Sequence, residues 1–158
     1  MLWEEFRSHA LPLLGERFPP NLIEDNGDCI VVTSRRDVRS YVLTEDERGV
    51  VIAFEGGRNT VVPFSITQSL ELAATCLTLL ARDQIATLTD MSYTPRDLLG
   101  PVPHTTFSIA KKSPPFFKLT STIDPTVSAT CRSFACARAI AEAYGLQHPQ
   151  TQTSQPRC

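Results

Sequence analysis

The sequence predicts an α+β fold in which an antiparallel β meander packs against helices. Three observations predict it: an opening segment with helical spacing, a series of short β-branched runs about ten residues apart, and two later segments with helical spacing. The chain has 158 residues, of which 42% are hydrophobic and 20% are charged. These values are ordinary for a globular protein, so we expect a single domain over residues 1–146.

The opening segment predicts a helix, because its apolar residues recur at helical spacing: Trp3, Phe6, Ala10 and Leu13 or Leu14. Pro12 lacks a backbone donor and crowds the preceding turn, so we expect the helix to kink or restart near residue 11. Pro19 and Pro20 then mark its end.

After this helix the hydrophobic period changes to two. Strands are predicted over residues 29–33, 40–44, 50–55 and 60–64, each bounded by turn residues such as Asn26-Gly27-Asp28. Ser65-Ile66-Thr67-Gln68 matches a capping box and predicts the start of a helix whose apolar stripe is Leu70, Ala73, Leu77 and Leu80.

The second half repeats this order. A Pro-rich loop from Tyr93 to His104 leads to predicted strands over 106–110, 116–120 and 127–131, then a helix capped by Ser133 and stopped by Gly145. The shared order suggests two divergent strand-strand-strand-helix repeats, over 20–83 and 104–146. Residues 147–158, rich in Gln, Pro, Thr and Ser, are predicted to be a disordered tail.

Composition and the opening residues argue against a membrane or secreted protein. No apolar run approaches the ~18 residues of a membrane span, and acids occupy positions 4 and 5, where a signal peptide would carry positive charge. The five cysteines form no CxxC pair, and four lie in apolar stretches, where free cysteine behaves as a small hydrophobe. We therefore expect a soluble, cytoplasmic protein that contacts no membrane.

The sequence contains no recognisable catalytic or metal-binding motif. The three histidines flank no nucleophile motif, and Cys131 and Cys136 lack the second pair that a zinc site needs. We therefore expect no catalytic residues, no metal, no cofactor and no enzymatic activity. An alternative is a small enzyme built around His104, with Asp90, Tyr93 or Asp97 nearby in sequence.

Charge is unevenly distributed along the chain. Residues 1–97 contain nine Lys and Arg against fifteen Asp and Glu, whereas residues 98–158 contain six against two. Lys111, Lys112 and Lys118 bracket Phe116 and Phe117, a pattern that can stack nucleobases. Because the sequence pI is about 5.9, we expect no nucleic-acid partner, and we interpret one or both of the phenylalanines as core residues of a strand.

Exposed turns on a rigid sheet commonly carry recognition residues. Three turns are candidates: residues 35–39, residues 45–48 and residues 111–115. The predicted partner-binding residues are Arg35, Arg36, Arg39, Glu45, Asp46, Glu47, Arg48, Lys111 and Lys112.

Residues 24–34 contain Asn26-Gly27-Asp28-Cys29-Ile30-Val31-Val32, and residues 39–43, 48–51 and 64–80 supply two further strands and a helix. These stretches resemble a family of small bacterial immunity proteins from polymorphic toxin systems, in which a D-G-D-x-I-V-I strand is followed by two strands and a helix. The chain is similar to the group that includes the antitoxin of the tuberculosis necrotizing toxin, an NAD-hydrolysing enzyme.

The resemblance implies an immunity protein that binds a cognate toxin, with NAD hydrolysis as one candidate toxin activity, and inhibits it by occluding the active site. A chaperone or adaptor for a secreted effector is the alternative from another class.

Overall fold

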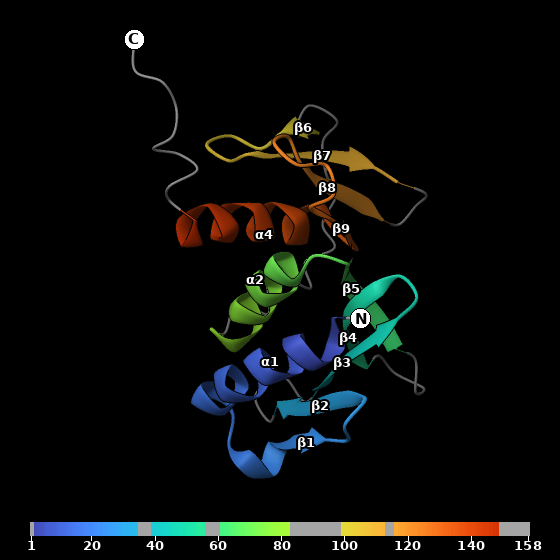
Figure 1. Cartoon of the computed structure of the whole chain (residues 1–158), viewed down its shortest axis with the longest axis vertical. Coiled ribbons are helices and arrows are strands. Elements are labelled where there is room, and N and C mark those ends of the chain that lie inside the picture. The colour runs from blue at the N-terminus through green and yellow to red at the C-terminus, as the bar shows by residue number, and fades with distance from the viewer. Residues whose placement is uncertain (1, 35–38, 56–60, 83–98, 113–115, 149–158) are drawn as a thin grey trace.

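The computed structural model describes residues 2–34, 39–55, 61–82, 99–112 and 116–148. These residues form an α+β fold with one antiparallel sheet, in the strand order β1-β2-β3-β4-β5-β9-β8-β7-β6 (Figure 1). The strands are β1 (Ile23–Asp25), β2 (Cys29–Ser34), β3 (Arg39–Asp46), β4 (Gly49–Glu55), β5 (Val61–Thr67), β6 (Gly100–Pro101), β7 (Phe107–Lys111), β8 (Phe117–Ser121) and β9 (Ser128–Cys131). The α+β prediction is confirmed.

Three described helices, α1 (Trp3–Arg17), α2 (Leu70–Ala81) and α4 (Phe134–Gln147), cover one face of the sheet (Figure 1). The alternate residues of the strands that face these helices are apolar and buried, as the period of two requires. One continuous core results, which includes Phe6 of α1, Leu43 of β3, Leu77 of α2, Leu119 of β8 and Ile140 of α4.

The predicted strands are all present, with bounds that differ by at most three residues. Strands β1 and β6 were missed, the second because the whole stretch to His104 was predicted as a loop. Each has only two or three residues, which is too short for a period-two pattern to be visible. They are strands because their backbones pair with β2 and β7, which sequence alone does not reveal.

The predicted capping box at Ser65 is wrong. Residues 65–67 belong to β5, where they pair with both β4 and β9. The helix begins four residues later, and the Ser69 hydroxyl caps it by accepting a hydrogen bond from the Leu72 amide at 3.3 Å. Pairing on both sides therefore outweighs the local capping signal at Ser65. The second cap is confirmed, since the Ser133 hydroxyl accepts from the Cys136 amide at 3.0 Å.

Proline and glycine interrupt the helices less than predicted. Helix α1 runs unbroken through Pro12, whose missing N–H would have bonded to the carbonyl of exposed Ser8, which water can satisfy. Helix α4 continues through Gly145 to Gln147, because Gly145 is buried inside the structure. The predicted tail therefore starts too early by at least one residue, and residues 149–158 lie outside the described residues.

The sheet is arranged symmetrically about the β5–β9 pair. Strands β3, β4 and β5 on one side are matched by β7, β8 and β9 on the other, and each set is followed by a helix that starts at a capping serine. Ile66 pairs with Thr130 at the centre, flanked by Ser65 with Cys131 and Thr67 with Ala129. This order agrees with that of the two repeats suggested from the sequence, and their common origin stays a prediction.

A β-bulge in β5 places Phe64 in the core and links this strand to α4. Ser65 pairs with Ile52 and Pro63 with Ala53, so Phe64 is the extra residue between them. Its ring is 1% exposed and stacks on Phe54 at 6.0 Å between centroids. Its carbonyl accepts bonds from the Arg132 amide and the Cys136 thiol, which ties β5 to the start of α4.

Three cysteines are buried where α2, α4 and β9 meet: Cys76, Cys131 and Cys136. Burial raises the pKa of the Cys76 thiol, and the neighbouring Cys131 together with burial raises that of Cys136. Thiolates are therefore disfavoured at neutral pH, and thiolates are the reactive form. The packing interpretation of these cysteines is confirmed.

We expect brief iodoacetamide treatment of the folded protein to alkylate half-buried Cys29 and to leave Cys76, Cys131 and Cys136 unmodified. Peptide mass spectrometry measures this, with a sample alkylated in denaturant as the control. Alkylation of the three buried thiols at the rate seen in denaturant would contradict the packing described above.

Among the described residues, no helix combines the length and the apolar character needed to cross a membrane.

Candidate binding site

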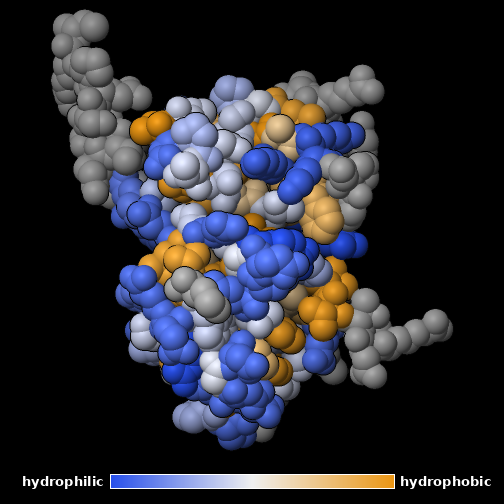
Figure 2. Space-filling view, turned by 45° about the vertical axis from the view of Figure 1, so that its right-hand side comes forward, coloured by the Kyte–Doolittle hydropathy of each residue, from blue (hydrophilic) through white to orange (hydrophobic). Residues whose placement is uncertain are grey.

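The sheet face opposite the helices is built by the other half of each strand. Val51, Ala53 and Ile66 form a small apolar cluster there, separate from the main core. A row of paired residues crosses the sheet from Ile66 on β5 to Thr130 on β9 and Lys118 on β8. No described helix covers this face, which Figure 2 brings partly into view with hydrophilic and hydrophobic residues side by side.

An open hollow of about 490 Å³ lies on this face, at the junction of the two halves of the sheet. It is lined from several segments distant in sequence, including Arg48, Gln68, Lys112, Phe116, Lys118 and Thr130. The β3–β4 turn and the β7–β8 hairpin therefore contribute side chains to the same hollow across the β5–β9 pair.

The register of β7 and β8 explains why two lysines enter the hollow. Lys111 pairs with Phe117, which packs on the core, so the adjacent positions 112, 116 and 118 face the other way. The Lys112 amide donates to the Phe116 carbonyl at 3.1 Å, and the Lys112 ammonium lies 3.4 Å from the Thr130 hydroxyl. Within the described part of the chain, neither Lys112 nor Lys118 forms an ion pair.

Arg48 is held by its own turn. Its guanidinium donates to both carboxylate oxygens of Asp46, at 2.7 to 3.3 Å, and its amide donates to Asp46 at 2.8 Å. These bonds hold the pKa of Asp46 below its usual range and raise that of Arg48. The pair is exposed, so it fixes the orientation of Arg48 more than it stabilises the fold.

A second, acidic hollow lies on the other side of the same turn. Glu45, Asp46 and Glu47 line it with Leu2, Gly49 and Gln68. One carboxylate oxygen of Glu45 accepts from the Leu2 amide at 2.9 Å, and the other is buried without a hydrogen-bond partner among the described residues. Arg48 and Gln68 therefore separate a basic hollow from an acidic one.

The structure places five of the predicted partner-binding residues in two neighbouring hollows. Arg48 and Lys112, which are distant in sequence, meet in one hollow, while Lys111 is exposed outside it. Glu45, Asp46 and Glu47 line the neighbouring hollow. Arg35 and Arg36 lie outside the described residues, and Arg39 begins β3.

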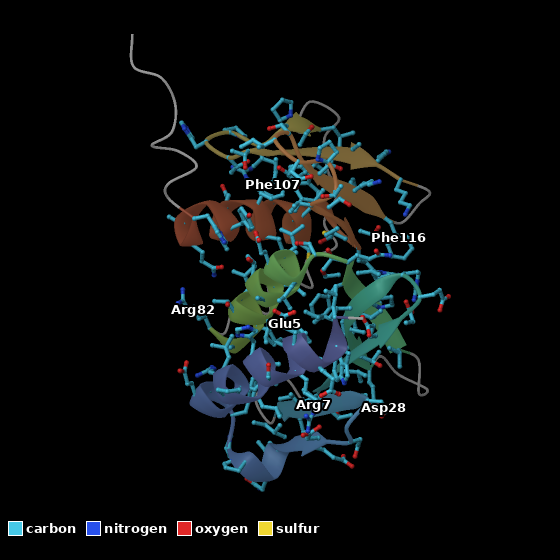
Figure 3. All side chains as sticks on the ribbon, in the orientation of Figure 1. Glu5, Arg7, Asp28, Arg82, Phe107 and Phe116 are labelled. Atoms are coloured by element: carbon cyan, nitrogen blue, oxygen red, sulfur yellow. The ribbon has the colours of Figure 1, made fainter. Side chains whose placement is uncertain are left out.

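Phe116 and Phe117, of which one or both were expected in the core, are divided between the two faces. Phe117 packs against the core and meets Phe134 edge-on at 6.5 Å. Phe116 is half-buried and lines the hollow, so Phe117 is the one of the two that joins the core. Figure 3 shows the contrast between Phe116 at the outer side of the sheet and Phe107, which contacts Tyr144 of α4 at 5.1 Å.

Sequence reasoning missed a polar cluster that joins α2 to α4. The Tyr144 hydroxyl donates to Glu71 at 2.6 Å, and the His148 ring stacks on Tyr144 at 4.0 Å. Burial and the Glu71 carboxylate raise the pKa of Tyr144 to about 12. No sequence signal pairs residues 73 positions apart, and we interpret the cluster as a link between the two helices.

His104, the centre of the alternative enzyme hypothesis, is exposed in a turn with a φ of 63°. Asp90, Tyr93 and Asp97 lie outside the described residues. Over the described ranges, no group of three or more His, Cys, Asp or Glu side chains could hold a metal ion.

Comparison with family models, curated proteins and solved structures found no match.

Proposed function

We propose that the protein is an immunity protein that binds a cognate toxin through the helix-free face of its sheet and occludes the toxin's active site. The observation that supports this proposal is the open hollow where Arg48, Lys112 and Lys118 meet beside Phe116. These side chains come from two hairpins of one hydrogen-bonded sheet, so the backbone positions that carry them are fixed, and Asp46 also orients the guanidinium of Arg48. Preorganisation of this kind lowers the entropy cost of association.

The chemistry of the hollow suits a protein interface. Stable interfaces bury about 800 Å² on each partner, and a few aromatic and basic anchors contribute most of the binding energy. Phe116 offers an apolar surface, and Arg48 offers an oriented guanidinium. The resemblance to immunity proteins is the reason for proposing a toxin as the partner. The geometry of the hollow is the reason for proposing this surface as the binding site.

The first test is capture of the partner from extract of the native cells with the tagged full-length chain. We expect a protein recovered in near-equal amount to arrest growth when it is expressed alone, and co-expression of this chain to restore growth. Recovery of a secreted protein that has no toxicity would overturn the proposal in favour of a chaperone.

A matched pair of variants tests the binding face. Thr120→Arg places a bulky cation on the helix-free face, since Thr120 alternates with buried Leu119. Leu146→Arg makes the same charge change on α4, where Leu146 is 83% exposed. We expect only Thr120→Arg to lose protection against the toxin. Equal protection by both variants would place the interface elsewhere.

A further inference from the structure

The basic hollow carries positive charge that its surroundings leave free. Lys118 has no ion pair and Lys112 has only the Thr130 hydroxyl among the described residues. Arg48 contributes little net charge because Asp46 neutralises it. Two lysines therefore remain to attract an anion.

The two acids of the second half, Asp124 and Glu142, form no ion pair with these lysines among the described residues. Asp124 accepts from the amide and the hydroxyl of Thr126, at 3.1 and 2.6 Å, which lowers its pKa. Glu142 pairs with Arg138 on α4, which covers the other face of the sheet. Neither carboxylate neutralises the two lysines.

Apolar and acidic surfaces flank this charge. Phe116 and Ile66 line the same hollow as the lysines. Across Gln68 lies the acidic hollow, where Glu45 and Glu47 are the carboxylates that Arg48 does not neutralise. A continuous polyanion such as a nucleic acid strand would run from the lysines onto these acids and be repelled, whereas a folded protein can present isolated carboxylates to the lysines alone.

We infer that the basic hollow binds an acidic segment of the partner protein, with carboxylates against Lys118 and Lys112 and an apolar side chain against Phe116. This inference rests on the proposed function for the nature of the partner. The lysines supply attraction and orientation, and Phe116 supplies contact area. The contacts are solvent-exposed, so binding weakens as salt rises.

The test uses the isolated full-length protein and a short synthetic peptide in which glutamates alternate with leucines and serines. We expect ¹⁵N–¹H spectra at low salt to show peptide-dependent shifts of amides in the hollow, such as Gln68 and Thr130, and to lose them at high salt. A single-stranded oligothymidylate of equal charge is the competing probe. No shifts with the peptide, or tighter binding of the oligothymidylate, would overturn the inference.

Two charge reversals provide the control. Lys118→Glu and Lys111→Glu change the net charge equally, and Lys111 is exposed on the same hairpin but outside the hollow. We expect Lys118→Glu to weaken peptide binding roughly fivefold or more and Lys111→Glu to change it much less. Equal weakening by both would indicate attraction to net charge alone, which would contradict a specific site.

Failure of this inference and failure of the proposed function give different results. If the toxin is neutralised but the peptide does not bind the hollow, the partner docks without an acidic segment. If the peptide binds and Lys118→Glu weakens it, while no toxin is neutralised, the hollow recognises acidic segments in another kind of partner.

Discussion

Phe64→Ala is expected to lower the free energy of unfolding by about 3–5 kcal/mol. The ring is 1% exposed, and its removal leaves a cavity between β4, β5 and the helices. The bulge that aims the ring inward also positions the carbonyl bonded by Arg132 and Cys136, so the surrounding structure has little freedom to collapse into the cavity. Urea unfolding followed by circular dichroism measures the loss.

Val61→Ala on the same strand is the control. Val61 is 51% exposed, so its truncation should cost less than about 1 kcal/mol. Similar losses for the two variants would show that Phe64 is not the core residue described here.

Gly49→Ala is expected to cost about 3 kcal/mol or more. Gly49 has a φ of +125°, and an added Cβ would overlap the Thr67 carbonyl oxygen and lie 2.6 Å from its carbon and 2.9 Å from the Gln68 nitrogen. Backbone strain of about 1–3 kcal/mol adds to a steric overlap of similar size. Because these contacts are with backbone, the β3–β4 turn itself must move.

Gly27→Ala separates these two costs. Gly27 also has a positive φ, +86°, but an added Cβ would meet nothing within 4 Å. Its loss should therefore be the strain alone, about 1–2 kcal/mol. Thermal or urea unfolding measures both variants, and equal losses would refute the close approach at Gly49. A displaced turn should also shift the amide signals of Arg48 and Gln68.

Local sequence signals were sufficient for most of the elements. The β-branched and aromatic runs at residues 29–33 and 50–55, each bounded by turn residues, predicted strands that the structure contains, because such residues favour the extended backbone. The cap at Ser133 was also predicted correctly, since a hydroxyl three residues before an amide is a local relation.

The failures share a different cause. Ser65 has the local signature of a cap, but its backbone pairs with Ile52 and Cys131, and the second partner lies 66 positions away. Phe116 and Phe117 are neighbours of the same residue type, and the register of β7 with β8 decides which of them faces the core.

The binding hollow was likewise predictable only in part from the sequence. Residue type alone identified Arg48 and Lys112 as candidates on separate turns, because charged residues in turns face water. Their meeting depends on the antiparallel pairing of β5 with β9, which brings the two halves of the sheet edge to edge.

The sequence by itself determined the α+β class, the order of the longer elements and the charge imbalance between the halves, because these follow from short-range periodicity and composition. The tertiary structure decided which face each residue occupies and which distant turns meet. Those outcomes depend on strand register and long-range pairing, and a shift of one residue in register would move Lys118 to the helix side of the sheet.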